Sequence, residues 1–305
     1  MYIFLPIAAI PALIILISYI TFRITFLSVR KKHFNLYHGL EGNLTEIKRK
    51  SRSMIERMAA IPYEDIYIKS YDGLKLHARY YHARDGAPIA IQFHGYKSMS
   101  VRDFSGGAYE CIRMEHNLLL VDQRAHGESE GNVISFGIKE RFDCRSWVNY
   151  ATERFGSGAQ IILYGISMGA ATVLMASELE LPKTVIGIVA DCPYSSPGAI
   201  IKKVCRDIHL PPVIFYPFIK IGARLFGGFN LDDASPKEAV KNTKIPILLI
   251  HGEGDNFVPC SMSDEIAEAN AAISYLKISE ATHGLSFLYD YESYMKTLRE
   301  FLKKI

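Results

Sequence analysis

From Tyr63 onward the chain alternates short apolar runs with stretches of amphipathic, helical pattern. The apolar runs predict eight strands, at residues 66–69, 74–80, 89–93, 118–121, 161–164, 186–189, 247–250 and 275–278. Helical patterns fill the intervals, at residues 103–116, 139–155, 168–180, 236–242, 261–271 and 290–303. The first two strands flank the turn signal Tyr71-Asp72-Gly73, whereas the later runs are uniformly apolar, which is typical of strands covered on both faces. The order predicts an α/β fold with a mostly parallel, doubly wound sheet.

One stretch interrupts this alternation. Residues 195–233 are rich in Pro, Ile, Phe and Tyr and stand between two predicted strands. Insertions of this length inside a compact domain are usually functional lids, so we expect a small cap here. A simple packing excursion over the core is the alternative.

The N-terminal segment differs from the body. No residue from Tyr2 to Phe22 is charged, and twenty helical residues rise about 30 Å, the thickness of a bilayer's hydrocarbon core. A cleaved signal peptide would carry a basic start and a small-residue cleavage site, and neither is present. We expect a transmembrane anchor at residues 1–25, a basic juxtamembrane linker at 26–60 and the body at 61–305. Arg23, Arg30, Lys31 and Lys32 follow the segment, so the positive-inside rule predicts a cytoplasmic body.

Charge is distributed unevenly along the chain. Residues 23–57 carry a net charge of +6 and the remainder a net charge of −3. Within the linker, residues 41–60 have apolar positions near helical spacing with basic residues between them, which predicts a helix near anionic headgroups or a solvated connecting helix. No basic stripe with interleaved aromatic residues occurs in the body, so we expect no nucleic-acid binding.

Composition is that of an ordinary globular protein, with 49% apolar and 22% charged residues. The five cysteines are scattered, and none has the spacing of a zinc site or of a disulfide framework. The cysteines therefore predict neither a zinc site nor a disulfide framework. We expect no cofactor.

The clearest chemical motif is Gly165-Ile166-Ser167-Met168-Gly169, between the predicted strand ending at Tyr164 and a helical run. This tight strand-to-helix turn needs small residues two before and two after the serine, and it exposes the serine hydroxyl at the edge of the sheet. The motif predicts that Ser167 is a nucleophile.

A serine nucleophile needs a base that is oriented by a carboxylate. Asp255 follows the predicted strand at 247–250 and His283 follows the last strand, in the order serine, acid, histidine that this fold uses. We therefore predict Ser167, Asp255 and His283 as a catalytic triad. Asp191, which also ends a strand, is the alternative acid.

Acyl transfer also needs hydrogen-bond donors for the developing oxyanion. The backbone N–H of Met168, directly after the nucleophile, is one expected donor. The other is expected from the loop His94-Gly95-Tyr96, after the strand at 89–93, and we assign it to the N–H of Tyr96.

These residues, together with the stretch from Asp122 to Gly131, resemble the serine aminopeptidase and monoacylglycerol-lipase-like branch of the α/β-hydrolases. Within that branch the chain is most similar to bacterial membrane-anchored hydrolases of the Bem46-like type. The resemblance covers roughly residues 63–305 and implies an eight-stranded sheet, the same triad and oxyanion donors, and no metal. One departure is Ala125, where the family usually has glycine.

These features predict a serine hydrolase that cleaves acyl esters or thioesters through an acyl-enzyme. The cap would supply an apolar pocket for the acyl group, for which we name Phe215, Tyr216 and Phe218, and membrane tethering suggests lipid-derived substrates. A peptidase or amidase with the same triad and a catalytically silent membrane scaffold are the alternatives.

Overall fold

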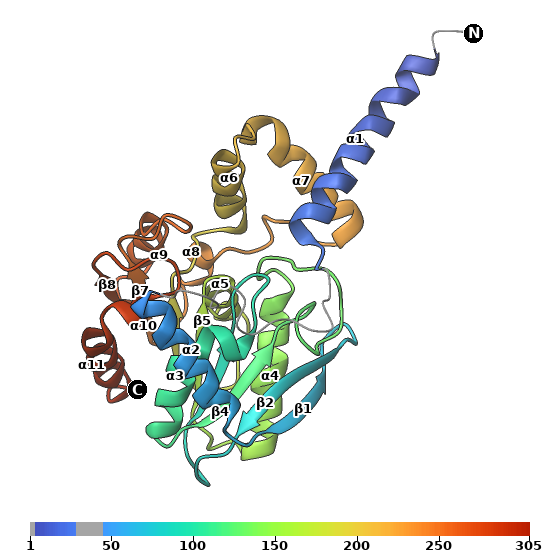
Figure 1. Ribbon diagram of the computed structural model, residues 1–305. Helices are drawn as coiled ribbons and strands as arrows, with labels where there is room; N and C mark the ends of the chain where they lie inside the picture. Colours follow the sequence, from blue (N-terminus) through green and yellow to red (C-terminus); the bar gives the residue numbers. More distant parts are fainter. Residues whose placement is uncertain (1–3, 29–44) are drawn as a thin grey trace.

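The structure is a computed structural model that describes residues 4–28 and 45–305 (Figure 1). Its centre is an eight-stranded sheet with the strand order β1-β2-β4-β3-β5-β6-β7-β8. The strands are β1 (Glu64–Lys69), β2 (Lys75–Tyr81), β3 (Ile89–Phe93), β4 (Asn117–Asp122), β5 (Ile161–Ile166), β6 (Val185–Asp191), β7 (Ile247–Gly252) and β8 (Ser274–Ile278). β2 pairs antiparallel with β1 and with β4, and the other neighbouring strands are parallel. The predicted mostly parallel sheet is confirmed.

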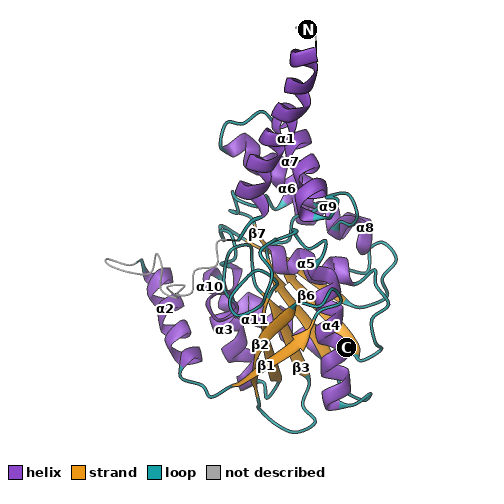
Figure 2. Cartoon of the chain, turned by 90° about the vertical axis from the view of Figure 1, so that its right-hand side faces the viewer, coloured by secondary structure: helices purple, strands orange, loops and turns teal. Residues whose placement is uncertain are grey.

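Helices cover both faces of this sheet (Figure 2). One face carries α4, α5 and α9, and the other carries α3 and α11, with α2 packed on the outside of α3. The bounds of the helices in the body are α2 (Glu46–Ala59), α3 (Ser100–Arg113), α4 (Glu140–Phe155), α5 (Met168–Ala176), α8 (Pro236–Ala239), α9 (Ser261–Ala269), α10 (Ser286–Tyr289) and α11 (Tyr291–Leu302). Because every residue of β3 and β4 is buried, the uniformly apolar runs are explained by cover on both sides.

The expected cap insertion consists of two helices, α6 (Pro197–Asp207) and α7 (Pro212–Gly227). It leaves the sheet after β6 and returns before β7. The carboxyl ends of the parallel strands meet at one edge of the sheet, so the cap stands over the edge at which β5, β7 and β8 also end.

The N-terminal helix α1 (Phe4–Phe26) extends away from the sheet (Figure 1). Its segment Ala9–Phe26 has a mean hydropathy of 1.9. By length and composition this segment could cross a membrane. The second half of α1 packs against α7, and Ser18, Phe22 and Phe26 are buried there. α1 and the cap therefore form one packed unit.

The helical pattern predicted within 41–60 corresponds to α2. Ile55 and Met58 on this helix are buried, because α2 packs against α3. The helix is therefore a part of the body and not a solvated connection. Residues 29–44 of the expected linker, including Arg30, Lys31 and Lys32, lie outside the described residues.

Candidate active site

Ser167 stands in the turn between β5 and α5. Its backbone is strained, with φ at 55° and ψ at −115°, a combination that L-residues rarely adopt. A Cβ at Gly165 would lie 2.3 Å from the carbonyl oxygen of Gly169, and a Cβ at Gly169 would lie 1.8 Å from the carbonyl oxygen of Phe93. Only glycine fits at these two positions, so the spacing of the motif has a direct steric cause.

The three side chains predicted as a triad lie in one hydrogen-bonded chain. The Ser167 Oγ is 2.9 Å from Nε2 of His283, and Nδ1 of His283 is 2.6 Å from Oδ2 of Asp255. Ser167 and Asp255 are buried, whereas the His283 side chain is one-quarter exposed. The ends of three strands, distant in sequence, thus bring together a nucleophile, a base and a carboxylate within hydrogen-bond distance.

Asp255 is held in its ionised form. Burial by itself would raise the pKa of this carboxyl, but hydrogen bonds from His251 and His283 outweigh burial and lower the pKa well below its usual range. The other oxygen, Oδ1, accepts hydrogen bonds of 2.9 Å from the N–H groups of Phe257 and Val258. The carboxylate is therefore both charged and fixed in orientation.

Asp191, the alternative acid, has other partners. Its Oδ1 accepts a 3.2 Å hydrogen bond from the Ser286 hydroxyl, and burial raises the pKa of Asp191 to about 6. The geometry favours Asp255 as the residue that orients His283.

The thiol of Cys192 lies beside this group, with its sulfur and one ligand atom each of Asp255 and His283 within 4.8 Å of one another. Zinc binding to cysteine requires the thiolate. Burial raises the pKa of Cys192 well above its ordinary value, and the two other groups are already hydrogen-bonded to each other. These observations favour the hydrogen-bonded chain over metal ligation.

The loop after β3 passes directly next to Ser167. A Cβ at Gly95 would lie 3.5 Å from the Cβ of Ser167, which shows how closely this loop approaches. Asp103 on α3 holds the loop, because its carboxyl accepts a 2.7 Å hydrogen bond from the Gly95 N–H and a 2.5 Å hydrogen bond from the Ser98 hydroxyl. The N–H of Lys97 donates a 3.0 Å hydrogen bond to Nε2 of His126. The neighbourhood of the Tyr96 amide is therefore anchored on both sides.

His94 and His126 serve this loop as neutral side chains. Burial lowers the pKa of both, and that of His126 falls to about 3. His94 accepts from the N–H of Gln123 and bonds the Gly95 carbonyl. Since neither imidazole gains a proton near neutral pH, both act as fixed hydrogen-bond partners.

The second expected oxyanion donor, the N–H of Met168, is the first amide of α5. Amides in the first turn of a helix have no acceptor within that helix, and they point toward its N-terminal end. This end carries Ser167. The Met168 amide therefore lies next to Ser167.

A cavity of about 590 Å³ opens beside Ser167 and His283. Its walls come from α2, α3, α10 and α11, together with Phe257, whose ring lies edge-on to His283 at 5.0 Å. The apolar side chains that line it include Met54, Ile55, Phe104, Phe287, Met295 and Leu298. The volume lies within the range of small-molecule sites.

The three cap residues named for the acyl pocket do not line this cavity. Tyr216 packs on α6, where a Cβ at Gly198 would lie 2.6 Å from its hydroxyl oxygen, and Phe215 and Phe218 lie on the same helix, α7. The buried face of α7, formed by Ile219, Gly222 and Ala223, is directed to α1 and the cap core. From the sequence, the apolar residues of the cap had no known partner other than a substrate. In the structure α1 is that partner, because it packs against α7.

Sequence reasoning also missed Asp103 and the wall formed by α2. The amphipathic pattern of α2 indicated an apolar face but not its partner. Asp103 had no motif around it, and its role follows only from contact with a loop eight residues earlier.

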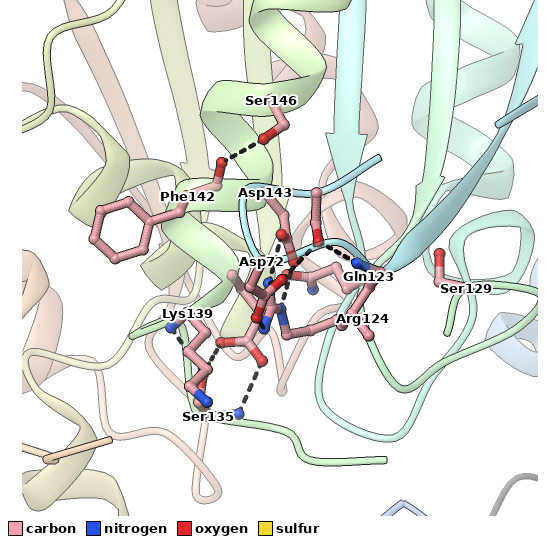
Figure 3. A network of polar contacts seen from close by, with 12 residues as sticks. Asp72, Gln123, Arg124, Ser129, Ser135, Lys139, Phe142, Asp143 and Ser146 are labelled. Atoms are coloured by element: carbon pink, nitrogen blue, oxygen red, sulfur yellow. Dashed lines mark hydrogen bonds and ion pairs between the residues drawn. The ribbon is translucent and has the colours of Figure 1, made fainter. Parts of the chain in front are cut away.

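The departure at Ala125 lies in a strained loop. Ala125 has a φ of 65°, in the left-handed region that favours glycine. The preceding residue, Arg124, is buried and forms ion pairs with Asp72 and Asp143 (Figure 3). This charge-assisted network holds the loop after β4, which in turn carries His126.

Comparison with known proteins agrees with this architecture. The uncharacterized protein YqkD of Bacillus subtilis is 28% identical over 188 residues, which span 61% of this chain and 62% of YqkD. Protein bem46 of Schizosaccharomyces pombe is 25% identical over 192 residues, or 57% of this chain and 54% of that protein. A solved structure of the Pyrococcus furiosus esterase Pf2001 has a TM-score of 0.64 at 23% identity and covers 87% of this chain and 95% of its own.

No family model matches the chain. The eight-stranded sheet, the cap after β6 and these relatives nevertheless agree with one another, and they support a hydrolase. The chain has the α/β-hydrolase fold, and in sequence it is similar to the Bem46-like α/β-hydrolases.

Proposed function

We propose that this protein is a serine hydrolase that cleaves carboxylic esters or thioesters, with Ser167 as nucleophile, His283 as base and Asp255 as the orienting acid. The observation that carries the proposal is the continuous chain of hydrogen bonds, 2.9 Å and 2.6 Å long, through these three side chains. A strained nucleophile at a helix N-terminus and a cavity directly beside it support the same activity.

In the proposed reaction Nε2 of His283 accepts the proton of the Ser167 hydroxyl while Oγ attacks the acyl carbon. The ionised Asp255 stabilises the imidazolium that forms. The N–H groups of Met168 and Tyr96 donate to the oxyanion, and the alcohol or thiol leaves with the proton from His283. Water then gives a proton to His283 and attacks the acyl-enzyme, the bond to Oγ breaks, and His283 returns the proton to Oγ, which releases the carboxylic acid and restores Ser167.

The cavity lining supports an apolar acyl group as the part of the substrate that is held. Three acidic side chains also line the cavity, but each has a partner within the protein. Asp103 is bonded to Gly95 and Ser98, Glu110 to Arg113, and Asp191 to Ser286. A peptidase that holds a substrate amine needs free carboxylates, so these contacts favour esters over aminoacyl amides.

A fluorophosphonate probe tests the nucleophile directly. We expect the full-length protein to be labelled at Ser167 and Ser167→Ala not to be labelled. Ser157→Ala, which changes an exposed serine at the opposite end of β5, serves as the matched control and should label like wild type. Absence of labelling in wild type would refute the serine-hydrolase proposal.

The substrate class is tested by comparing acyl esters and thioesters of increasing chain length with aminoacyl amides. Preference for the esters or thioesters, with a dependence on chain length, is the expected outcome. Faster turnover of the amides would establish the peptidase alternative instead.

We further propose that α1 anchors the protein in a membrane with the hydrolase body in the cytoplasm. Arg23 in the last turn of α1, followed by the basic residues 30–32 of the sequence, supports this orientation. We expect an added protease to cleave the body in permeabilised cells but not in intact cells. Cleavage in intact cells would show that the body lies outside the cytoplasm.

A further inference from the structure

Large exposed aliphatic side chains gather in two neighbouring parts of the described chain. Among the residues that the structure describes, every large exposed Ile, Leu or Val belongs to α1 or to the cap. Val213 is 89% exposed, and the other cap residues are Ile208, Ile214, Ile221 and Leu225, with Phe226 beside them. An apolar surface of this extent marks an interaction site.

The two groups form one continuous surface. A Cβ at Gly222 would lie 2.4 Å from the carbonyl oxygen of Ser18, so this glycine allows α7 to approach α1 closely. The ring of Phe226 lies 5.1 Å from that of Tyr19 and 5.8 Å from that of Phe22. In both views the cap extends from the sheet on the same side as α1 (Figures 1 and 2).

The length of the uncharged segment fixes how deep this surface lies. The part of α1 before Arg23, Phe4 to Phe22, carries no charge, and at helical rise it spans about 28 Å, close to the thickness of the hydrocarbon core. If α1 spans a bilayer, the boundary of the hydrocarbon therefore lies near Arg23. Ser18, which contacts α7, is about 7 Å inside that boundary.

Parts of α7 that touch Ser18, Tyr19 and Phe22 must then enter the membrane with them. The charges on α7 are compatible with this position, because the helix contains no acidic residue, Lys220 is paired with Asp232, and Arg224 is a long cation. Such side chains extend their charge to the headgroup region while their stems remain in apolar surroundings. Cations there also favour anionic lipids.

We infer that the cap enters the lipid bilayer beside α1 through its helix α7, with Val213, Ile214, Leu225 and Phe226 in contact with lipid. The inference rests on the proposed membrane anchor. The cap stands over the edge of the sheet that carries Ser167, so immersion holds this edge at the membrane surface, where acylated lipids are available.

Depth-dependent quenching of tryptophan tests the inference with the full-length protein in phosphatidylcholine–phosphatidylglycerol vesicles. Trp147 is the one native tryptophan and is buried in the core, so it provides a constant background. The cap probes are Val213→Trp and Leu225→Trp. Leu13→Trp reports on α1, and Tyr289→Trp, an exposed position on α10, is the matched control. Each variant must retain fluorophosphonate labelling equal to wild type.

We expect brominated lipids to quench both cap probes to an extent comparable with Leu13→Trp, and to leave Tyr289→Trp unquenched. Bromine near the glycerol end of the acyl chain should quench the cap probes more strongly than bromine near the methyl end, because the cap enters by only about 7 Å. Quenching of Leu13→Trp without the cap probes would overturn the inference and leave the anchor intact. Quenching of none would overturn both, and equal quenching of Tyr289→Trp would show that the cap has no preferred contact.

Discussion

The hydroxyl of Tyr96 donates a 2.7 Å hydrogen bond to the carbonyl oxygen of Thr25. Tyr96 lies in the loop beside the proposed nucleophile, and Thr25 is in the last turn of α1, whose final carbonyls have no partner within the helix. The Lys97 ammonium also bonds the Ile24 carbonyl, and the N–H of Ile134 donates to the Phe26 carbonyl. The proposed anchor therefore ends on the loop that supplies a proposed oxyanion donor.

The first prediction concerns this link. Tyr96→Phe keeps the backbone N–H but loses the bond to Thr25, so the loop gains freedom and the Thr25 carbonyl loses a partner. We expect kcat for an acyl ester to fall a few-fold and the protein to lose about 1 kcal/mol of stability, or about 2–4 °C in Tm. Steady-state kinetics and thermal unfolding measure the two effects. Tyr289→Phe, at an exposed position, should change neither, and equal behaviour of the two variants would mean that the link has no role in catalysis.

The second prediction concerns the steric cause of the motif. Gly169→Ala would place a Cβ 1.8 Å from the Phe93 carbonyl oxygen, which forces α5 away from β3. We expect a loss of about 3 kcal/mol or more in stability and loss of fluorophosphonate labelling. Gly158→Ala is the matched control, since nothing lies within 4 Å of a Cβ there. Wild-type labelling of Gly169→Ala would contradict the proposed fit.

The third prediction assigns a positioning role to Asp103. Asp103→Asn keeps one acceptor oxygen but replaces the other with an N–H₂ group, which cannot accept from both Gly95 and Ser98. The loop next to Ser167 should shift, and kcat should fall about tenfold with little change in KM, less than the loss expected when an oxyanion donor is removed. Kinetics with one ester over a range of concentrations separate kcat from KM. Asp85→Asn, on a fully exposed side chain, should be neutral, and a rise in KM alone would instead place Asp103 in substrate binding.

The fourth prediction concerns the pH dependence of stability. Burial raises the folded-state pKa of Asp191 from 3.8 to about 6. A raised pKa means that the folded state binds the proton more tightly than the unfolded state, so the contribution is complete below about pH 4 and is lost as pH rises through 6. The amide of Asp191→Asn does not titrate, so this variant does not lose stability as the pH rises. Its stability should therefore rise relative to wild type between pH 4 and 7, by at most about 3 kcal/mol.

Thermal unfolding at several pH values between 4 and 7 measures this difference. Parallel curves for the two proteins would show that Asp191 does not titrate in this range. Asp191→Asn should also retain hydrolysis, whereas Asp255→Asn should lose about four orders of magnitude in kcat, because only Asp255 orients His283. The reverse result would make Asp191 the acid.

The sequence by itself determined the strands, the main helices and the order of the three proposed catalytic residues. These depend on short-range information: an apolar run of strand length, a helical period, and the turn from Gly165 to Gly169 in which the steric conflict involves near neighbours. It also determined that the N-terminal segment is uncharged up to Phe22 and that the stretch forming α2 has one apolar face.

Only the tertiary structure decided what those faces touch. An apolar helix face predicts burial but does not identify the partner. The contacts of α1 with α7 and of α2 with α3 therefore could not be predicted from the sequence, and neither could the hydrogen bond between Asp103 and Gly95. For that reason the acyl pocket was expected under the cap, at Phe215, Tyr216 and Phe218, whereas the cavity is lined by α2, α3, α10 and α11. The apolar surface of the cap is instead divided between α1 and the exterior, which is the basis for assigning it to the membrane.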